Sequence, residues 1–110
     1  MLIVKEVFIA KPGSAGKLAK MMKSMVSVDD SMKNAKVLLD FVTDFNKIVI
    51  EHEVESLAEF EKGMEDYKKN PDPKMMEMMK GYTDLYQTGY REIYKVVDWT
   101  NFQGNIFLKL

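Results

Sequence analysis

The chain has 110 residues, of which 46% are hydrophobic and 30% are charged, so one globular domain with a buried core is expected and a disordered chain is excluded. Its 16 Lys and Arg residues nearly balance 17 Asp and Glu residues, and the formal charge of -1 argues against nucleic acid as a partner. The absence of cysteine excludes disulfides and thiolate chemistry, and the single histidine, His52, excludes a metal centre with several histidine ligands, so neither a metal nor another cofactor is expected.

The N-terminal residues are apolar but do not have the pattern of a signal peptide, because Lys5 and Glu6 interrupt the apolar run in its middle. The sequence holds no run approaching the roughly 18 apolar residues of a membrane span. A cytoplasmic location without membrane attachment is therefore the expectation.

The start of the chain predicts a strand followed by a helix. Residues 2–10 are rich in Ile, Val and Phe and end at the breaker Pro12-Gly13, which is typical of a strand. Ser14 is a potential N-cap for the next helix. Apolar residues then recur at spacings of three and four, as on one helix face: Leu18, Met21, Met22 and Met25.

Alternation of side chains predicts two strands, at 35–43 and 47–55, joined by a hairpin turn at 44–46. One of their faces is apolar apart from His52 and suits packing under helices. It carries Val37, Leu39, Phe41, Ile48, Ile50 and Val54. The other face mixes apolar and acidic side chains, namely Leu38, Asp40, Val42, Val49, Glu51 and Glu53.

Ser56 and Glu59 form a capping-box pattern that opens a second helix. Two prolines within 70–73 interrupt this helix, and a second helical piece is expected from about residue 74. Residues 89–97 are expected to form the last strand, and an unusually apolar tail comes after it at 98–110.

The predicted order of strand, helix, two strands, helix and strand indicates a ferredoxin-like α+β domain over 1–97, with a four-stranded antiparallel sheet and both helices on one face. The other face must then meet water, a ligand or another subunit. Its mixture of apolar and acidic groups, together with the apolar tail at 98–110, predicts a homodimer in which the tail packs on the dimer.

The stretch Gly89-Tyr90-Arg91-Glu92-Ile93-Tyr94-Lys95-Val96-Val97, coming after a broken helix with Asp66-Tyr67-Lys68-Lys69-Asn70-Pro71, resembles the final strand of NIPSNAP-like and antibiotic-biosynthesis-monooxygenase-like proteins. The resemblance implies a dimeric α+β barrel, in which two sheets pack face to face and share a cavity on their non-helical faces. That superfamily includes cofactor-free oxygenases, heme-degrading enzymes and isomerases. The Asn, Trp and His set of the heme-degrading members has no matching positions here.

His52 is the natural acid or base, because its ordinary pKa lies near neutrality. The alternative is a hydrogen-bonded, inert histidine at the boundary between sheet and helices. The carboxylates of Asp40, Glu51 and Glu53 form a second candidate group, with solvated surface acids as the alternative. A third set comprises Tyr90, Glu92 and Tyr94, which alternate on one face of the last strand and are explained equally well by ordinary sheet packing.

Two functions remain open from the sequence, and it does not decide whether the protein is an enzyme. The first is a cofactor-independent oxygenase acting on a small phenol- or quinol-like molecule. His52 would be the base, Asp40 or Glu92 would hold it, and Glu51, Tyr90 and Tyr94 would bind the substrate. The second is a non-catalytic homodimer that binds a small apolar ligand or only assembles. The direction of His52 distinguishes the two: if it points under the helices, the oxygenase loses its best base, whereas a His52 that faces a cavity beside a carboxylate or tyrosine favours the enzyme.

Overall fold

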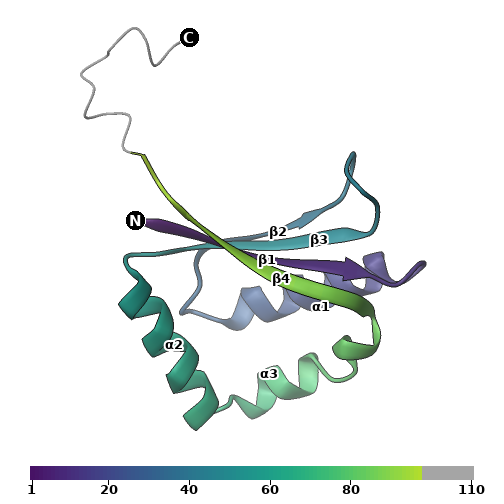
Figure 1. The fold of residues 1–110 in the computed structure, drawn as a ribbon. Coiled ribbons are helices and arrows are strands. Elements are labelled where there is room, and N and C mark those ends of the chain that lie inside the picture. Colours follow the sequence, from purple (N-terminus) through teal and green to yellow (C-terminus); the bar gives the residue numbers. More distant parts are fainter. Residues whose placement is uncertain (98–110) are drawn as a thin grey trace, which may run out of the picture.

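The computed structural model describes residues 1–97, and the predicted packing of the tail at 98–110 lies outside the described residues. The chain runs through a strand, a helix, a pair of strands, two helices, a 3-10 turn and a last strand (Figure 1). Their bounds are β1 Leu2–Ala10, α1 Ala15–Val28, β2 Lys33–Leu39, β3 Lys47–Val54, α2 Leu57–Lys69, α3 Pro73–Met78, η1 Tyr82–Asp84 and β4 Tyr86–Lys95.

The four strands form one antiparallel sheet in the order β2-β3-β1-β4, and the helices lie together on one side of it (Figure 1). This is the predicted ferredoxin-like α+β fold. We call the side away from the helices the open face.

Alternation along β3 determines which of its residues are buried. The side chains of Ile48, Ile50, His52 and Val54 are all buried on the helix side, as predicted. Leu18 and Met22, one turn apart on α1, are almost completely buried against Ile48 and Ile50. These contacts form the core and orient α1 along the sheet.

Several element boundaries differ from the sequence prediction. β2 ends at Leu39 rather than at residue 43, because residues 40–46 leave the sheet as a loop, in which Phe45 and Asn46 have positive φ angles of 79° and 56°. The predicted placement of Phe41 under the helices is therefore wrong, and its side chain is 97% exposed. β4 begins at Tyr86 rather than at residue 89, because only a short helix and a 3-10 turn separate it from the prolines.

The two predicted helix caps have different outcomes. The Ser56 side chain accepts a hydrogen bond from the Glu59 amide at 3.1 Å, as the capping-box pattern predicts. Ser14 occupies the N-cap of α1, but its side chain makes no capping hydrogen bond.

Helix α2 contributes no buried residue to the core, although it is amphipathic. The side chains of Leu57, Met64 and Tyr67 on its apolar side are 57%, 37% and 50% exposed. An amphipathic helix ordinarily packs its apolar face against the core, so the separation of α2 from the sheet requires an explanation. Among residues 1–97, no helix is long and apolar enough to cross a membrane.

Candidate functional site

A cavity of about 620 Å³ lies between the helix side of the sheet and the three helices. Its floor is formed by residues of β1, β3 and β4, and its walls are formed by α1, α2 and α3. Apolar side chains dominate the walls. They include Phe60, Tyr67 and Tyr82 and the methionines Met22, Met25, Met32, Met64, Met75 and Met79. The apolar side of α2 therefore borders this cavity instead of the sheet.

His52 lies on the floor of the cavity, in β3 and directly opposite Val4 of β1. Its side chain belongs to the buried set, at 8% exposure, and the described residues give its Nδ1 no hydrogen-bond partner. A buried polar atom without a partner costs free energy and is rare in native proteins. Among residues 1–97, Nδ1 of His52 is the one buried side-chain nitrogen or oxygen without a hydrogen-bond partner.

The pKa of the His52 imidazole is lowered from its ordinary value of 6.5, chiefly because burial disfavours the charged form. The carboxylates of Glu6 and Asp29 oppose this effect, while the Arg91 guanidinium adds to it. The imidazole is therefore neutral at pH 7 and keeps one nitrogen able to accept a hydrogen bond.

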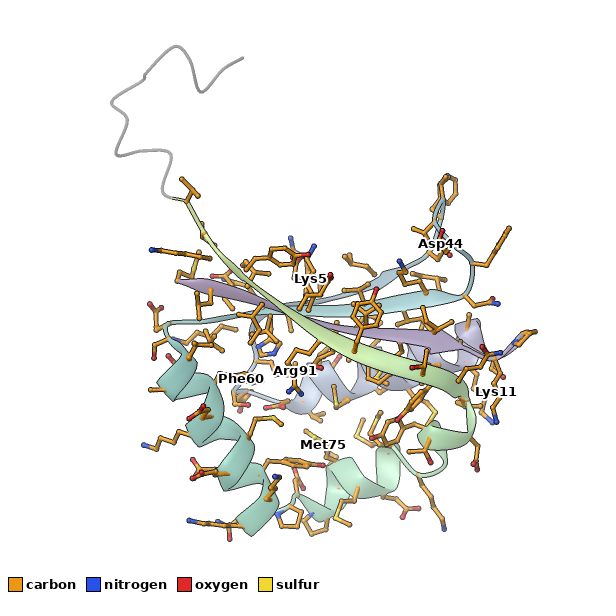
Figure 2. The ribbon with its side chains drawn as sticks, in the orientation of Figure 1. Lys5, Lys11, Asp44, Phe60, Met75 and Arg91 are labelled. Atoms are coloured by element: carbon orange, nitrogen blue, oxygen red, sulfur yellow. The ribbon has the colours of Figure 1, made fainter. Side chains whose placement is uncertain are left out.

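An ion pair lies beside His52 on the same side of the sheet. The Nε of Arg91 in β4 donates to Oε1 of Glu6 in β1, and the two residues are directly opposite in the strand register. The Arg91 guanidinium also lies over the Phe60 ring, 4.9 Å from its centroid. Arg91 and Phe60 point toward each other from β4 and α2 across the space between sheet and helices (Figure 2).

The tyrosines predicted for the site lie on the open face. In the register of β1 with β4, Tyr90 pairs with Val7, Glu92 with Lys5 and Tyr94 with Ile3, while Arg91 pairs on the cavity side. Glu51 is on the open face as well, where its carboxylate lies 3.7 Å from the Lys5 ammonium. The Lys5 ammonium also lies 5.3 Å from the centroid of the Tyr94 ring.

The predicted grouping of His52 with Glu92, Tyr90 and Tyr94 is therefore wrong, because successive residues of a strand point to opposite faces. Asp40 does not hold His52 either. Its amide donates to the Lys47 carbonyl, five residues before His52 in β3, and five residues of strand span about 16 Å. What the structure brings together instead is His52, Glu6, Arg91 and Phe60.

The nearby charge of Glu92 raises the pKa of the exposed Tyr94 phenol, which stays protonated at neutral pH. Burial likewise raises the pKa of the Tyr82 phenol on the cavity wall. At neutral pH both phenols therefore keep their protons, whereas the neutral imidazole of His52 has a nitrogen lone pair. No cluster of three or more His, Asp or Glu side chains suited to a metal ion occurs in the described part of the chain.

Sequence reasoning missed Glu6 and Phe60 as site residues and left the side of Arg91 undecided. One signal was present in β1, where Glu6 shares a side with Val4 and Phe8, so a charged group interrupts a row of apolar ones. Its partner Arg91 is 85 residues away in the chain. Only the strand register brings the two together.

The lowered pKa of His52 predicts how folding stability depends on pH. The unfolded chain takes up the proton near pH 6.5, whereas the folded protein takes it up only at lower pH. The contribution of His52 to stability is therefore present above about pH 6.5 and is lost as the pH falls through the folded-state pKa. A His52→Gln variant lacks this component, so urea denaturation at about pH 7.5 and about pH 5 should show a smaller loss of unfolding free energy than in the wild type. An equal loss in both proteins would contradict the burial of a neutral imidazole.

Several solved structures share this fold. A NIPSNAP domain protein from Burkholderia xenovorans superposes with a TM-score of 0.73 at 9% sequence identity, covering 90% of this chain and 97% of that one. A NIPSNAP family protein from Agrobacterium tumefaciens gives 0.74 at 12% identity, with 90% and 96% covered. A protein from Chloroflexus aurantiacus, assigned as an antibiotic biosynthesis monooxygenase, superposes with a TM-score of 0.64 at 14% sequence identity, covering 87% of this chain and 92% of that one.

These similarities confirm the predicted resemblance at the level of the fold, which is that of NIPSNAP-like and antibiotic-biosynthesis-monooxygenase-like proteins. No protein-family model matches the sequence, and no curated protein matches it. Identities of 9% to 14% carry no activity across to this chain.

Proposed function

We propose that the protein binds a small, flat apolar molecule bearing a hydroxyl group, of the phenol or quinol class, in the cavity between sheet and helices. One observation carries the proposal: a cavity with apolar walls has on its floor a buried, neutral His52 whose Nδ1 lacks a partner. The volume of about 620 Å³ falls within the range of about 300–1,000 Å³ typical of ligand pockets.

The charges on the floor favour a neutral ligand. Glu6 and Arg91 compensate each other, and His52 is neutral, so the floor of the cavity offers no unpaired charge to a strongly charged molecule. A hydroxyl group, in contrast, can donate to the imidazole nitrogen once a rotation of the ring turns the covered Nδ1 toward the cavity. The Phe60 ring and the guanidinium over it offer flat surfaces on which an aromatic ring can stack.

Methionine is suited to such a site. Its unbranched, polarisable side chain adapts to irregular apolar ligands, and six of the ten methionines line the cavity. The charged side chains that line the cavity away from its floor lie at the connection from α1 to β2 and on α2, and they are Asp29, Asp30, Lys33, Glu59, Lys62 and Asp66.

Cofactor-independent oxygenation is the second candidate, because His52 borders the cavity and its imidazole is neutral. A neutral imidazole can take the hydroxyl proton of a bound phenol or quinol, and the electron-rich anion left behind can react with molecular oxygen. The enzyme and the non-catalytic binding protein share the binding step and differ only in whether the bound molecule then reacts. His52 points under the helices, so the predicted oxygenase site on the open face has lost its base, and any reaction at His52 would take place in the cavity on the helix side of the sheet.

We further propose that the protein is a homodimer, with the open face turned toward the second copy. Three exposed side chains on that face support this: Leu38 at 43%, Tyr90 at 48% and Tyr94 at 48%. Exposed apolar groups of this size on one surface are typical of an interface.

Binding is tested with 1-naphthol and with 1-methylnaphthalene, which has the same shape without the hydroxyl donor. Calorimetry of the wild type should show roughly tenfold tighter binding of 1-naphthol, as expected for one hydrogen bond to a buried acceptor. His52→Phe should bind both molecules alike. No binding of either one, or the same preference in both proteins, would refute the proposal.

Oxygen uptake with a panel of anthrols and quinols then separates the two candidates. Uptake by the wild type that is lost in His52→Phe would establish the oxygenase, whereas tight binding without uptake would establish a binding protein.

A further inference from the structure

The loop between β2 and β3 carries the most exposed apolar side chains of residues 1–97. We call residues 40–46 the aromatic arm. Phe41, Val42 and Phe45 are 97%, 85% and 78% exposed, whereas no other large hydrophobic side chain among the described residues exceeds 57%. Two phenylalanines held almost entirely in water are unfavourable for a monomer and mark a surface that is covered by something else.

The backbone at the base of the aromatic arm is held in place. The Ala10 amide donates to the Asn46 carbonyl at 2.8 Å, and the Asp40 amide donates to the Lys47 carbonyl at 2.9 Å. Beyond this base, Phe45 has a φ of 79°, which a bulky side chain rarely adopts. Backbone strain of this kind persists where surrounding contacts compensate for it, yet the Phe45 side chain is itself mostly exposed.

The aromatic arm rises from the sheet on the side away from the helices. Asp44 stands above the sheet, on the side where Lys5 lies, while Phe60 and Met75 lie below it (Figures 1 and 2). The arm therefore borders the open face beside Leu38 of β2, whereas Tyr90 and Tyr94 of the same face lie on the opposite edge strand β4.

The charges around the aromatic arm distinguish between a membrane and a second copy of the chain. Asp40 and Asp44 lie within the arm, and two carboxylates beside the apolar tip oppose insertion into a lipid surface. The open face carries Lys36, opposite Glu51 in the register, and Lys36 forms no ion pair with another described residue. The open face also carries the carboxylates of Glu51 and Glu92, so it is mixed in charge, and Lys36 is the group on it that can pair with a carboxylate of another copy's arm.

We propose that the aromatic arm clasps a second copy of this chain, with Phe41 and Phe45 packed against that copy's open face. The clasp rests on the proposed homodimer and is independent of the cavity. In this arrangement Phe41 and Phe45 are the main apolar anchors of the interface, because a small number of aromatic side chains usually supplies most of the binding energy.

Sedimentation velocity of a Phe41→Ser/Phe45→Asn double variant tests the clasp. Asn is chosen at position 45 because it tolerates a positive φ, so the arm keeps its backbone conformation. The dimer dissociation constant should rise about a hundredfold or more, as removal of two anchors requires. Met76→Ser is the matched control, since Met76 is 55% exposed on α3, on the side away from the open face, and should leave dimerisation unchanged.

The outcomes separate the clasp from the other proposals. Both variants should keep the wild-type circular dichroism, melting temperature and 1-naphthol affinity, because the substituted side chains are exposed and lie outside the cavity. A double variant that dimerises like the wild type would overturn the clasp alone. A wild type that is monomeric at tens of micromolar would overturn the clasp and the homodimer together, and arm-dependent binding of that monomer to phosphatidylcholine vesicles would assign the arm to a membrane instead.

Discussion

Replacing Gly63 by phenylalanine should weaken 1-naphthol binding at least tenfold and, at the same time, stabilise the protein. Gly63 lies within α2 and lines the cavity, and a Cβ added there meets no atom within 4 Å. A phenylalanine ring at this position can occupy the space that the ligand needs. A glycine inside a helix costs about 0.5–1 kcal/mol relative to alanine, and phenylalanine recovers only part of this, so the melting temperature should rise slightly.

Two matched variants make this result specific. Gly63→Ala removes the glycine without filling the cavity and should stabilise the protein with little effect on binding. Gly16→Ala, in α1 and outside the cavity, also has no atom within 4 Å of an added Cβ and should leave binding unchanged. Unimpaired binding by a well-folded Gly63→Phe protein would place the ligand elsewhere.

The largest effect on stability is expected from Leu18→Ala. The Leu18 side chain is completely buried and belongs to the core cluster that joins α1 to the sheet. Truncation of such a leucine removes apolar contacts and leaves a cavity, which costs about 2–5 kcal/mol of unfolding free energy. Urea denaturation monitored by circular dichroism measures this change directly.

Met76→Ala provides the comparison for Leu18→Ala, because Met76 is 55% exposed and should change the unfolding free energy by less than about 0.5 kcal/mol. Similar losses in the two variants would show that α1 is not packed on the sheet as described.

Local patterns were enough to predict most of the fold. The spacing of Leu18 and Met22 identified the buried side of α1, and the alternation of Ile48, Ile50 and Val54 identified the buried side of β3. The Ser56 capping box located the start of α2. Each of these signals acts over a few residues, where helix and strand periodicity depend only on backbone geometry.

The site was predicted less well, because it depends on relations between distant segments. Periodicity correctly placed His52 on the side of Ile50 and Val54, but it could not show that α2 stands away from the sheet and leaves a cavity above this histidine. The pairing of Glu6 with Arg91 depends on the register of β1 with β4. Phe41 lies in the loop after β2, in which Phe45 and Asn46 have positive φ angles. A positive φ is rare for phenylalanine, so the residue type at position 45 did not predict this backbone.

A titration of methyl-13C-methionine-labelled protein with 1-naphthol, monitored by NMR, tests the central claim most directly. The ten methionines divide into six that line the cavity and four that do not. The lining residues are Met22, Met25, Met32, Met64, Met75 and Met79, and the others are Met1, Met21, Met76 and Met78. We expect saturable shifts concentrated in the six lining methyl groups. Shifts confined to the other four, or no shift in any of them despite measured binding, would contradict that claim.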